Sequence, residues 1–389
     1  MELTKKQEEG LKIAIERYKH KEKYTIIAGY AGTGKSTLVR FIIEALGVKE
    51  EEVCYATFTG KAAEVLRKKG NRNACTLHKL LYKSYPNKNG GFTRLPVSTI
   101  PYKIVVVDEI SMAPETLINQ LFTHRCYVIG LGDPFQLPPI DKNEDNHLLN
   151  HPHIFLDEVM RQAQDSEIIR LTMAIRNYQP LVNDYNKEVK ILPKNALNTG
   201  MLQWADQILV ATNNQRVAIN NQVRELLGRG ETPEDGDKVI CLRNYWNIFG
   251  DKEENPLVNG TIGFLRDTFI TTRYVPKEPL KFSILKGDVI TDTDYYSSLE
   301  MDNKMILTGE KCCDWKTSYR LEKKFRGEDI IPLEFTYGYA VTCHKAQGSE
   351  WSKVLVLEEN FPFQKEEHAR WLYTACTRAS EKLVLVTNH

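Results

Sequence analysis

A glycine-rich stretch, GYAGTGKST, spans residues 29–37 and matches the phosphate-binding pattern G-x-x-x-x-G-K-[ST]. Glycines at this spacing let backbone N–H groups close on phosphate oxygens, while Lys35 supplies a point charge and Ser36 a ligand for Mg²⁺. The alternative is a glycine-rich turn that only opens a helix. The predicted nucleotide-binding residues of this stretch are Gly29, Gly32, Thr33, Gly34, Lys35, Ser36 and Thr37.

An acidic pair follows the four apolar residues IVVV of KIVVVDEIS, where Asp108 and Glu109 end a predicted strand. A phosphate loop needs a carboxylate across the sheet to hold its metal ion, so Asp108 is predicted to bind Mg²⁺ with Ser36. Glu109 is predicted to be the base that orients the attacking water. An acidic pair at this position is otherwise often a helix cap.

A single amide is held between prolines in LGDPFQLPPI, residues 131–140. Gln136 follows the next predicted strand, and strand carboxyl ends are where open α/β sheets bind ligands. A neutral amide there can contact the terminal phosphate or its attacking water without competing for metal. Gln136 is therefore predicted to sense the nucleotide, although a solvated turn is the simpler reading of the stretch alone.

The elements that must position these groups alternate between strands and helices. Strand patterns cover residues 24–29, 53–58, 103–108 and 126–132, and helix patterns cover 35–46 and 60–69. A second alternation has strands at 207–212, 237–244, 354–359 and 382–387, with helices at 214–227 and 366–379. This order predicts an α/β fold with two doubly wound parallel sheets.

Two stretches interrupt the alternation. Residues 83–97 carry Asn89-Gly90-Gly91 between short polar and aromatic runs, which is a hairpin signal. Residues 246–334 contain short β-rich pieces with turn signals, typical of a small all-β insert.

Composition is that of an ordinary globular protein, with 42% apolar and 26% charged residues. The formal net charge of +1 means that any nucleic-acid-binding charge must be local to a groove. The eight cysteines include no CxxC pair, so reduced thiols in the cytoplasm are expected. The charged start MELTKKQEEG lacks the apolar core of a signal peptide, and no membrane-spanning run is visible.

These motifs together resemble the superfamily 1 helicases, specifically the RecD-like and Dda-type branch. The matching stretches run from Leu3 to Arg378. LTKKQ resembles the helicase Q motif, which implies that Gln7 reads the adenine edge. LDEVMRQ and WLYTACTRA resemble segments that supply arginines to the terminal phosphate, here Arg161 and Arg378.

The resemblance also implies residues that bind a nucleic-acid strand. TFTGKAAEVL and CTLHKLL resemble the single-strand contact motifs of the first domain, and VTCHKAQGSEW resembles the motif that links nucleic acid to nucleotide. The implied nucleic-acid contacts are Thr59, Gly60, Lys61, Thr76, His78, Thr342 and His344, and the implied nucleotide-side residues are Gln347, Gly348 and Glu350.

Aromatic residues are candidates for base stacking, although a core position is the simpler reading for each: Tyr82, Phe92, Trp204 and Trp246. Phe92 is further considered as the tip of a hairpin that separates the duplex, with a surface hairpin as the equal alternative.

The expected organisation follows from this resemblance. A first RecA-like domain covers residues 1–82 and 98–175, with the hairpin insert at 83–97. A second RecA-like domain covers 176–245 and 335–389, and its insert at 246–334 is expected to be an SH3-like module.

The resemblance implies an ATP- and Mg²⁺-dependent DNA helicase that moves 5′ to 3′ on single strands and acts on forked duplex DNA. We expect a cytoplasmic monomer without a membrane partner, and a single-strand-binding or replication protein is considered as a further partner. An RNA helicase or remodeller is one alternative. A non-motor, nucleotide-gated binding subunit of a replication or repair complex is the other.

Overall fold

The structure, a computed structural model, describes residues 3–86, 92–138, 146–182, 184–251, 256–292, 294–325 and 330–388. Its contacts divide the chain into two compact units. The first comprises Met1–Lys83, Pro96–Leu197 and Ala346–His389, and the second comprises Ser84–Leu95 and Asn198–Lys345. Within the described residues, no helix is long and apolar enough to cross a membrane.

The first unit contains a six-stranded sheet in which every strand is parallel to its neighbours. Its order is β3 (Cys75–Thr76), β2 (Val53–Thr57), β6 (Ile104–Val107), β7 (Tyr127–Gly132), β1 (Tyr24–Gly29) and β8 (Ile154–Leu156). The strands are continuous apolar runs because both faces of the sheet are covered. The predicted doubly wound parallel sheet is therefore present.

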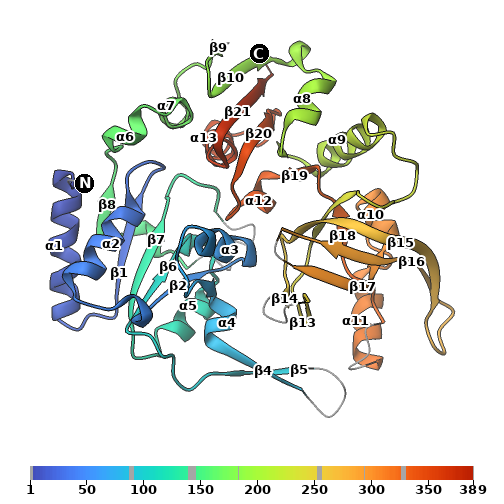
Figure 1. Cartoon of the computed structure of the whole chain (residues 1–389), viewed down its shortest axis with the longest axis horizontal. Coiled ribbons are helices and arrows are strands. Elements are labelled where there is room, and N and C mark those ends of the chain that lie inside the picture. The colour runs from blue at the N-terminus through green and yellow to red at the C-terminus, as the bar shows by residue number, and fades with distance from the viewer. Residues whose placement is uncertain are drawn as a thin grey trace. The chain divides into compact units, whose positions relative to one another are not determined.

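Helices pack on both faces of this sheet (Figure 1). One face buries Ile27 and Ile104 against α1 (Lys5–Lys19) and α2 (Lys35–Ala45), and the other buries Ile26 and Val105 against α4 (Leu77–Leu81) and α5 (Glu115–Leu121). Neighbouring strand residues point to opposite faces, so adjacent apolar positions serve the two separate cores. The remaining helices of this sheet region are α3 (Gly60–Lys68), α6 (Arg161–Gln164) and α7 (Glu167–Arg176).

The chain end returns to the first unit and adds a second set of strands. In this set β20 (Trp351–Leu357) and β21 (Ala379–Thr387) are parallel, β21 is parallel to β10 (Val189–Pro193), and β9 (Asp184–Tyr185) closes it antiparallel. The helix α13 (Lys365–Cys376) lies against α7 and these strands. Its residues Trp371 and Tyr373 are each 1% exposed, which makes this helix part of the core.

The second unit combines an α/β part with an antiparallel sheet. In the α/β part, β11 (Gln207–Val210) pairs in parallel with β19 (Ala340–Thr342), and α9 (Asn213–Leu226) packs on both. The helices α8 (Thr199–Trp204) and α12 (Cys343–Ala346) flank these strands in sequence. The antiparallel sheet has the order β17 (Tyr295–Asp302), β16 (Lys281–Ile290), β15 (Ile262–Tyr274), β12 (Lys238–Cys241) and β18 (Phe335–Tyr337).

The structure corrects two sequence expectations about the β-rich part. The strand predicted at 237–244 and the residues from 335 on fall within the predicted second α/β domain, but β12 and β18 pair inside the antiparallel sheet. The insert is also not all-β, because α10 (Asn303–Thr308) and α11 (Trp315–Lys324) lie within it. Both helices start at aspartates, Asp302 and Asp314, whose side chains accept a backbone N–H as N-caps.

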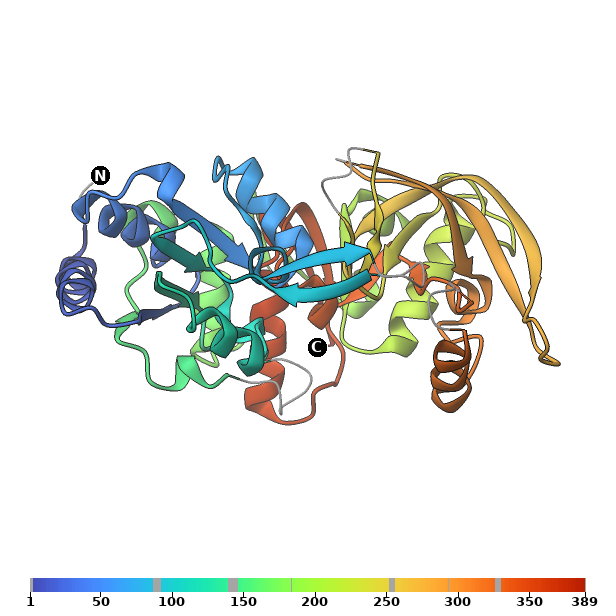
Figure 2. The ribbon, with the colours of Figure 1, turned by 90° about the horizontal axis from the view of Figure 1, so that it is seen from below.

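Short two-stranded pairings complete the described fold. The predicted hairpin consists of β4 (Tyr82–Pro86) and β5 (Phe92–Pro96), visible as a pair of arrows in Figure 2. Its turn, Asn89-Gly90-Gly91, lies outside the described residues. A second pair consists of β13 (Tyr245–Phe249) and β14 (Pro256–Leu257).

Candidate functional site

The glycine-rich loop lies between β1 and α2, at the carboxyl edge of the first sheet. Gly32 and Gly34 adopt the left-handed conformation, with φ of +75° and +76°, which a residue with a side chain rarely takes. Helix α2 starts after Gly34 without a side-chain cap. Its first N–H groups are therefore placed to bind an anion.

The Lys35 ammonium lies inside this loop. Its Nζ donates to the carbonyl oxygens of Gly29 and Tyr30, at 2.6 Å and 3.0 Å. Burial lowers the pKa of Lys35, and the nearby carboxylates of Asp133, Asp108 and Glu109 oppose that shift. Two neutral carbonyls leave the ammonium charge uncompensated at contact distance, so a phosphate is the natural partner for this group.

Gln7 supports the loop rather than standing free beside it. Its Oε1 accepts from the Thr4 backbone N–H at 3.0 Å, and its Nε2 donates to the Thr33 carbonyl at 3.1 Å. A Cβ added at Gly34 would lie 2.5 Å from Gln7 Nε2 and 2.3 Å from Met160 Sδ. Both the oxygen and the nitrogen of the Gln7 amide therefore form hydrogen bonds within the protein. The predicted contact with adenine is a separate role from these two bonds.

The acidic pair follows β6 directly. Asp108 accepts a hydrogen bond from the Glu109 backbone N–H at 3.0 Å. Glu109 has a φ of +49°, an uncommon conformation for a residue with a side chain. Burial raises the pKa of both carboxyls, with Lys35 opposing it most at Asp108 and Arg378 at Glu109.

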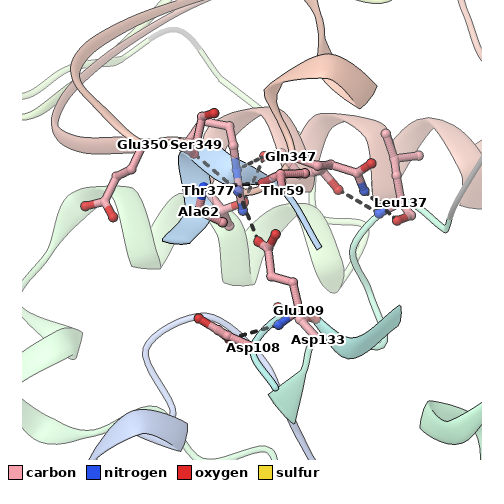
Figure 3. Close-up of polar contacts among 12 residues, drawn as sticks. Thr59, Ala62, Asp108, Glu109, Asp133, Leu137, Gln347, Ser349, Glu350 and Thr377 are labelled. Atoms are coloured by element: carbon pink, nitrogen blue, oxygen red, sulfur yellow. Dashed lines mark hydrogen bonds and ion pairs between the residues drawn. The ribbon is translucent and has the colours of Figure 1, made fainter. Parts of the chain in front are cut away.

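Arg378, just after α13, reaches the acidic pair from the last part of the chain. Its Nη1 lies 3.3 Å from Glu109 Oε1, and its guanidinium also donates to the carbonyls of Ser349 and Thr374. Figure 3 shows the Glu109 carboxylate directed toward the segment that holds Ser349. At 6% exposure, Arg378 is a buried cation with a fixed orientation.

Gly348 lies against the same carboxylate. Its φ is +74°, and a Cβ added there would lie 2.9 Å from Thr59 Oγ1 and 3.2 Å from Glu109 Oε2. The neighbouring Glu350 instead forms an ion pair with Lys69, at 2.7 Å. Three sequence motifs that are far apart in the chain therefore meet at Glu109.

The loop that carries Gln136 is held by groups from the last part of the chain. Gln347 Nε2 donates to the Leu137 carbonyl at 2.7 Å, as Figure 3 shows, and the Leu137 N–H donates to Thr374 Oγ1 at 2.9 Å. Arg370 donates to the Pro134 carbonyl at 3.0 Å. Gln347 thus holds the loop that carries Gln136.

Tyr373 is a site residue that sequence reasoning missed. Its Oη donates to Asp133 Oδ2 at 2.6 Å and accepts from the Ala31 N–H of the glycine-rich loop at 2.8 Å. Burial raises its pKa well above the usual value, so the hydroxyl stays protonated. Helical spacing was the available signal, because Arg370, Tyr373 and Thr374 stand at positions i, i+3 and i+4 of one helix.

Two of the predicted nucleic-acid contacts in the first unit are N-caps of helices. Thr59 and Thr76 are the N-caps of α3 and α4, where Thr59 Oγ1 accepts from Ala62 N–H at 3.3 Å and Thr76 Oγ1 from Lys79 N–H at 3.1 Å. A capping hydroxyl still has its own proton to donate to a phosphate. Gly60 opens α3, while Lys61 is ion-paired with Glu64 at 3.3 Å.

His78 and the second-unit contacts are placed as follows. The His78 ring lies between those of Phe58 and Tyr82, with centroids 5.9 Å and 6.3 Å away. Thr342 ends β19 and pairs with Val210. His344 is in α12, where burial lowers its pKa and favours the neutral ring. The side chains of Arg161, Phe92 and Trp246 lie outside the described part of the structure.

The donor set fits a magnesium nucleotide. In the described residues, no group of three or more His, Cys, Asp or Glu side chains could hold a metal ion by itself. Mg²⁺ is usually bound by one or two protein oxygens together with substrate phosphates, and Ser36 and Asp108 provide such oxygens beside the glycine-rich loop. The fold and this site define a P-loop nucleotide-binding protein with a buried arginine at its acidic pair.

Comparison with known proteins narrows this class. The AAA domain model matches residues 2–192, and the UvrD-like helicase C-terminal domain model matches residues 337–386. Together the two matches cover more than half of the chain. The chain belongs to the superfamily 1 helicases, in the branch that contains RecD2, Dda and Pif1.

The alignments with individual relatives cover different shares of this chain and of each relative. The ATP-dependent RecD2 DNA helicase of Deinococcus radiodurans is 27% identical over 92% of this chain and 46% of its own. The ATP-dependent DNA helicase Dda of phage T4 is 30% identical over 45% of this chain and 43% of its own. Each match therefore covers less than half the length of the relative.

A solved structure of Bacteroides Pif1 bound to single-stranded DNA has the same fold. It matches with a TM-score of 0.51 and 17% identity, over all of this chain and 93% of that one. The α/β class expected from the sequence is confirmed by this likeness.

Proposed function

We propose that this chain is an ATP-driven DNA helicase that translocates along single-stranded DNA and unwinds duplex DNA. The observation that supports it best is the meeting of Glu109 with Arg378 and Gly348 beside the glycine-rich loop. A nucleotide-gated binding subunit has no need for a buried arginine on a catalytic carboxylate. The names of the family relatives agree with this activity.

Each site residue then has a role in hydrolysis. Lys35, Arg378 and Arg161 stabilise the charge that develops on the terminal phosphate. Glu109 orients the attacking water and accepts its proton, and Gln136 senses the terminal phosphate. Ser36 and Asp108 would hold Mg²⁺, and a bound Mg²⁺ would supply neutralisation of the phosphate charge.

The buried contacts suggest how hydrolysis is transmitted. Tyr373 joins the glycine-rich loop to Asp133, and Gln347 joins the loop that carries Gln136 to the segment just after His344. A change at the terminal phosphate would therefore reach residues that we propose contact the strand: Thr59, Gly60, Lys61, Thr76, His78, Thr342 and His344. A ligand-dependent shift between two arrangements of such loops is the usual basis of a phosphate-driven motor.

Steady-state ATPase with and without oligo-dT tests the proposal, with Lys35→Ala as the control. We expect strong stimulation by the single strand that is absent in the control. Unstimulated activity would favour the nucleotide-gated binding subunit instead. Stronger stimulation by oligo-U than by oligo-dT would favour the RNA helicase, because the 2′-OH separates the two substrates.

The hairpin β4–β5 is proposed to separate the duplex through Phe92. We predict that Phe92→Ala lowers unwinding of a forked duplex several-fold while leaving single-strand-stimulated ATPase nearly intact, since stacking on a base is worth about 1–3 kcal/mol. A strand-displacement assay beside the ATPase assay measures both. Equal loss of the two activities would contradict a separating role.

A further inference from the structure

Helix α11 presents an unusual surface in the β-rich part of the second unit. This helix, labelled in Figure 1, is anchored by Leu321, which is 0% exposed and packs in a cluster with Phe282 and Ile284. Asp314 caps its start by accepting from Thr317 N–H at 3.0 Å. The rest of the helix surface is therefore held on a rigid support.

Two aromatic side chains stand exposed on this helix. Trp315 is 75% exposed and Tyr319 is 56% exposed. Their rings stack with centroids 5.6 Å apart and an interplanar angle of 17°. Residues four apart lie on one face of a helix, so the pair forms a pre-ordered aromatic ridge with its outer ring faces open.

Lysines lie beside this ridge. Lys316 and Lys323 are exposed, and helix geometry places them on the side of Tyr319. Among the described residues neither has an acidic partner, whereas the other two cations of the helix, Arg320 and Lys324, both pair with Glu278, at 3.1 Å and 2.6 Å. Glu322 lies on the other side of the ridge and is paired with Arg243 at 3.6 Å, so the positive charges of Lys316 and Lys323 adjoin the stacked rings.

Another exposed aromatic pair lies close in sequence to acidic residues. Phe363 is 86% exposed and contacts the Phe361 ring edge-on, with centroids 5.6 Å apart. Acidic residues Glu366 and Glu367 occupy the first turn of the helix that follows. Exposure of aromatic rings is therefore common to both sites, but only the α11 pair combines stacking geometry with uncompensated cations.

We propose that the α11 face formed by Trp315, Lys316, Tyr319 and Lys323 binds single-stranded DNA outside the helicase motifs. Bases stack on the outer ring faces and the lysines contact phosphates, the combination that sequence-independent single-strand sites use. The inference rests on the proposed function, because that function makes a single strand the substrate. Its effect would be to hold the strand at a point beyond the contacts of the helicase motifs.

Binding of a fluorescent oligo-dT, followed by anisotropy, tests the aromatic ridge. The Trp315→Ala/Tyr319→Ala double variant should bind roughly tenfold or more weakly, and Trp315→Phe should retain most of the affinity. Phe363→Ala is the matched control and should leave binding unchanged. Circular dichroism and thermal unfolding of the double variant establish that Leu321 still anchors the helix.

Salt dependence tests the lysines. If each contacts a phosphate, Lys316→Ala/Lys323→Ala should reduce the slope of log K against log[salt] by about 1.4, since each contact contributes about 0.7. Saturated ATPase rates should not change, because no α11 residue belongs to the nucleotide site. The oligo concentration for half-maximal stimulation should rise instead.

The outcomes separate the two proposals. If wild-type protein neither binds oligo-dT nor responds to it in ATPase, the proposed function fails. If wild-type binds and responds but the α11 variants behave identically to it, the α11 proposal alone is overturned.

Discussion

Single side chains decide how the nucleotide site is held together, and Tyr373 illustrates this best. One hydroxyl bridges the glycine-rich loop and Asp133, in a place with 1% exposure for the tyrosine and 7% for the aspartate. A buried carboxylate that loses a donor costs free energy because solvent cannot replace it.

We predict that Tyr373→Phe lowers the free energy of unfolding by about 1–3 kcal/mol and weakens nucleotide binding. The ring still fills its site, so only the hydrogen bonds are lost. Chemical denaturation and titration with a fluorescent ATP analogue measure the two effects. Tyr178→Phe, at a residue that is 43% exposed, is the control, and equal effects in the two variants would contradict the bridging role.

The charge of Arg378 is predicted to set the acidic limb of the ATPase pH profile. Burial raises the pKa of Glu109, while the adjacent guanidinium lowers it. A base must be deprotonated, so activity is lost as pH falls through that pKa. In Arg378→Gln the opposing cation is gone, and the limb should move to higher pH.

The shape of the profile is the readout, because the overall rate of this variant also falls. Arg378→Lys keeps the positive charge and should keep the limb close to its wild-type position. A limb that stays unchanged in Arg378→Gln would show that the carboxylate being titrated is not Glu109.

At the scale of elements, the glycine-rich loop depends on close packing as well as on backbone freedom. Gly34 and Gly47 both have positive φ, at +76° and +63°. Their surroundings differ. A Cβ added at Gly34 would collide with Met160 and Gln7, whereas a Cβ added at Gly47 would point into open space within the described part of the structure.

We predict that Gly34→Ala weakens nucleotide affinity at least tenfold, because α1 and Met160 must shift away from the loop. Gly47→Ala should cost only the left-handed strain of about 1–2 kcal/mol and leave affinity unchanged. Thermal unfolding and nucleotide titration of both variants separate strain from steric exclusion. Similar losses of affinity would refute the packing argument.

In the β-rich part, the sequence pattern did not predict helix α11. The helix α11 has a single buried residue, Leu321, so its apolar periodicity is too weak to stand out within a run of strands. Its cap and its charged side chains define it locally, but the aromatic ridge becomes evident only from exposure and ring geometry.

At the scale of the whole molecule, the first unit is built from three separated segments of the chain. Residues 346–389 therefore reach the glycine-rich loop and the acidic pair only once the chain has folded. In the folded chain this segment forms hydrogen bonds with Leu137 and Glu109, which are more than two hundred residues away in sequence.

Membership of the RecD2, Dda and Pif1 branch leads to a prediction about direction. We expect 5′ to 3′ movement, measured by displacement of streptavidin from biotin at either end of a single strand. Displacement from the 3′ end alone is the expected result, and it should require ATP. Displacement from the 5′ end alone would overturn the predicted polarity while leaving the motor activity in place.

The sequence by itself determined the local chemistry of this protein. The spacing of Gly29, Gly34, Lys35 and Ser36, and the position of Asp108 after an apolar strand, follow from short-range geometry that a loop and a strand impose. Alternating strand and helix patterns likewise predicted the α/β class, because periodicity reflects which faces are buried.

Tertiary structure alone decided which distant groups share one site. Nothing local indicates that Tyr373 reaches Ala31, that Gln347 holds Leu137, or that β12 joins an antiparallel sheet. Such pairings depend on how the chain closes on itself, and many partners of equal local propensity compete for each. Burial then turns these contacts into large effects on pKa and orientation, which is why the folded chain was needed to see them.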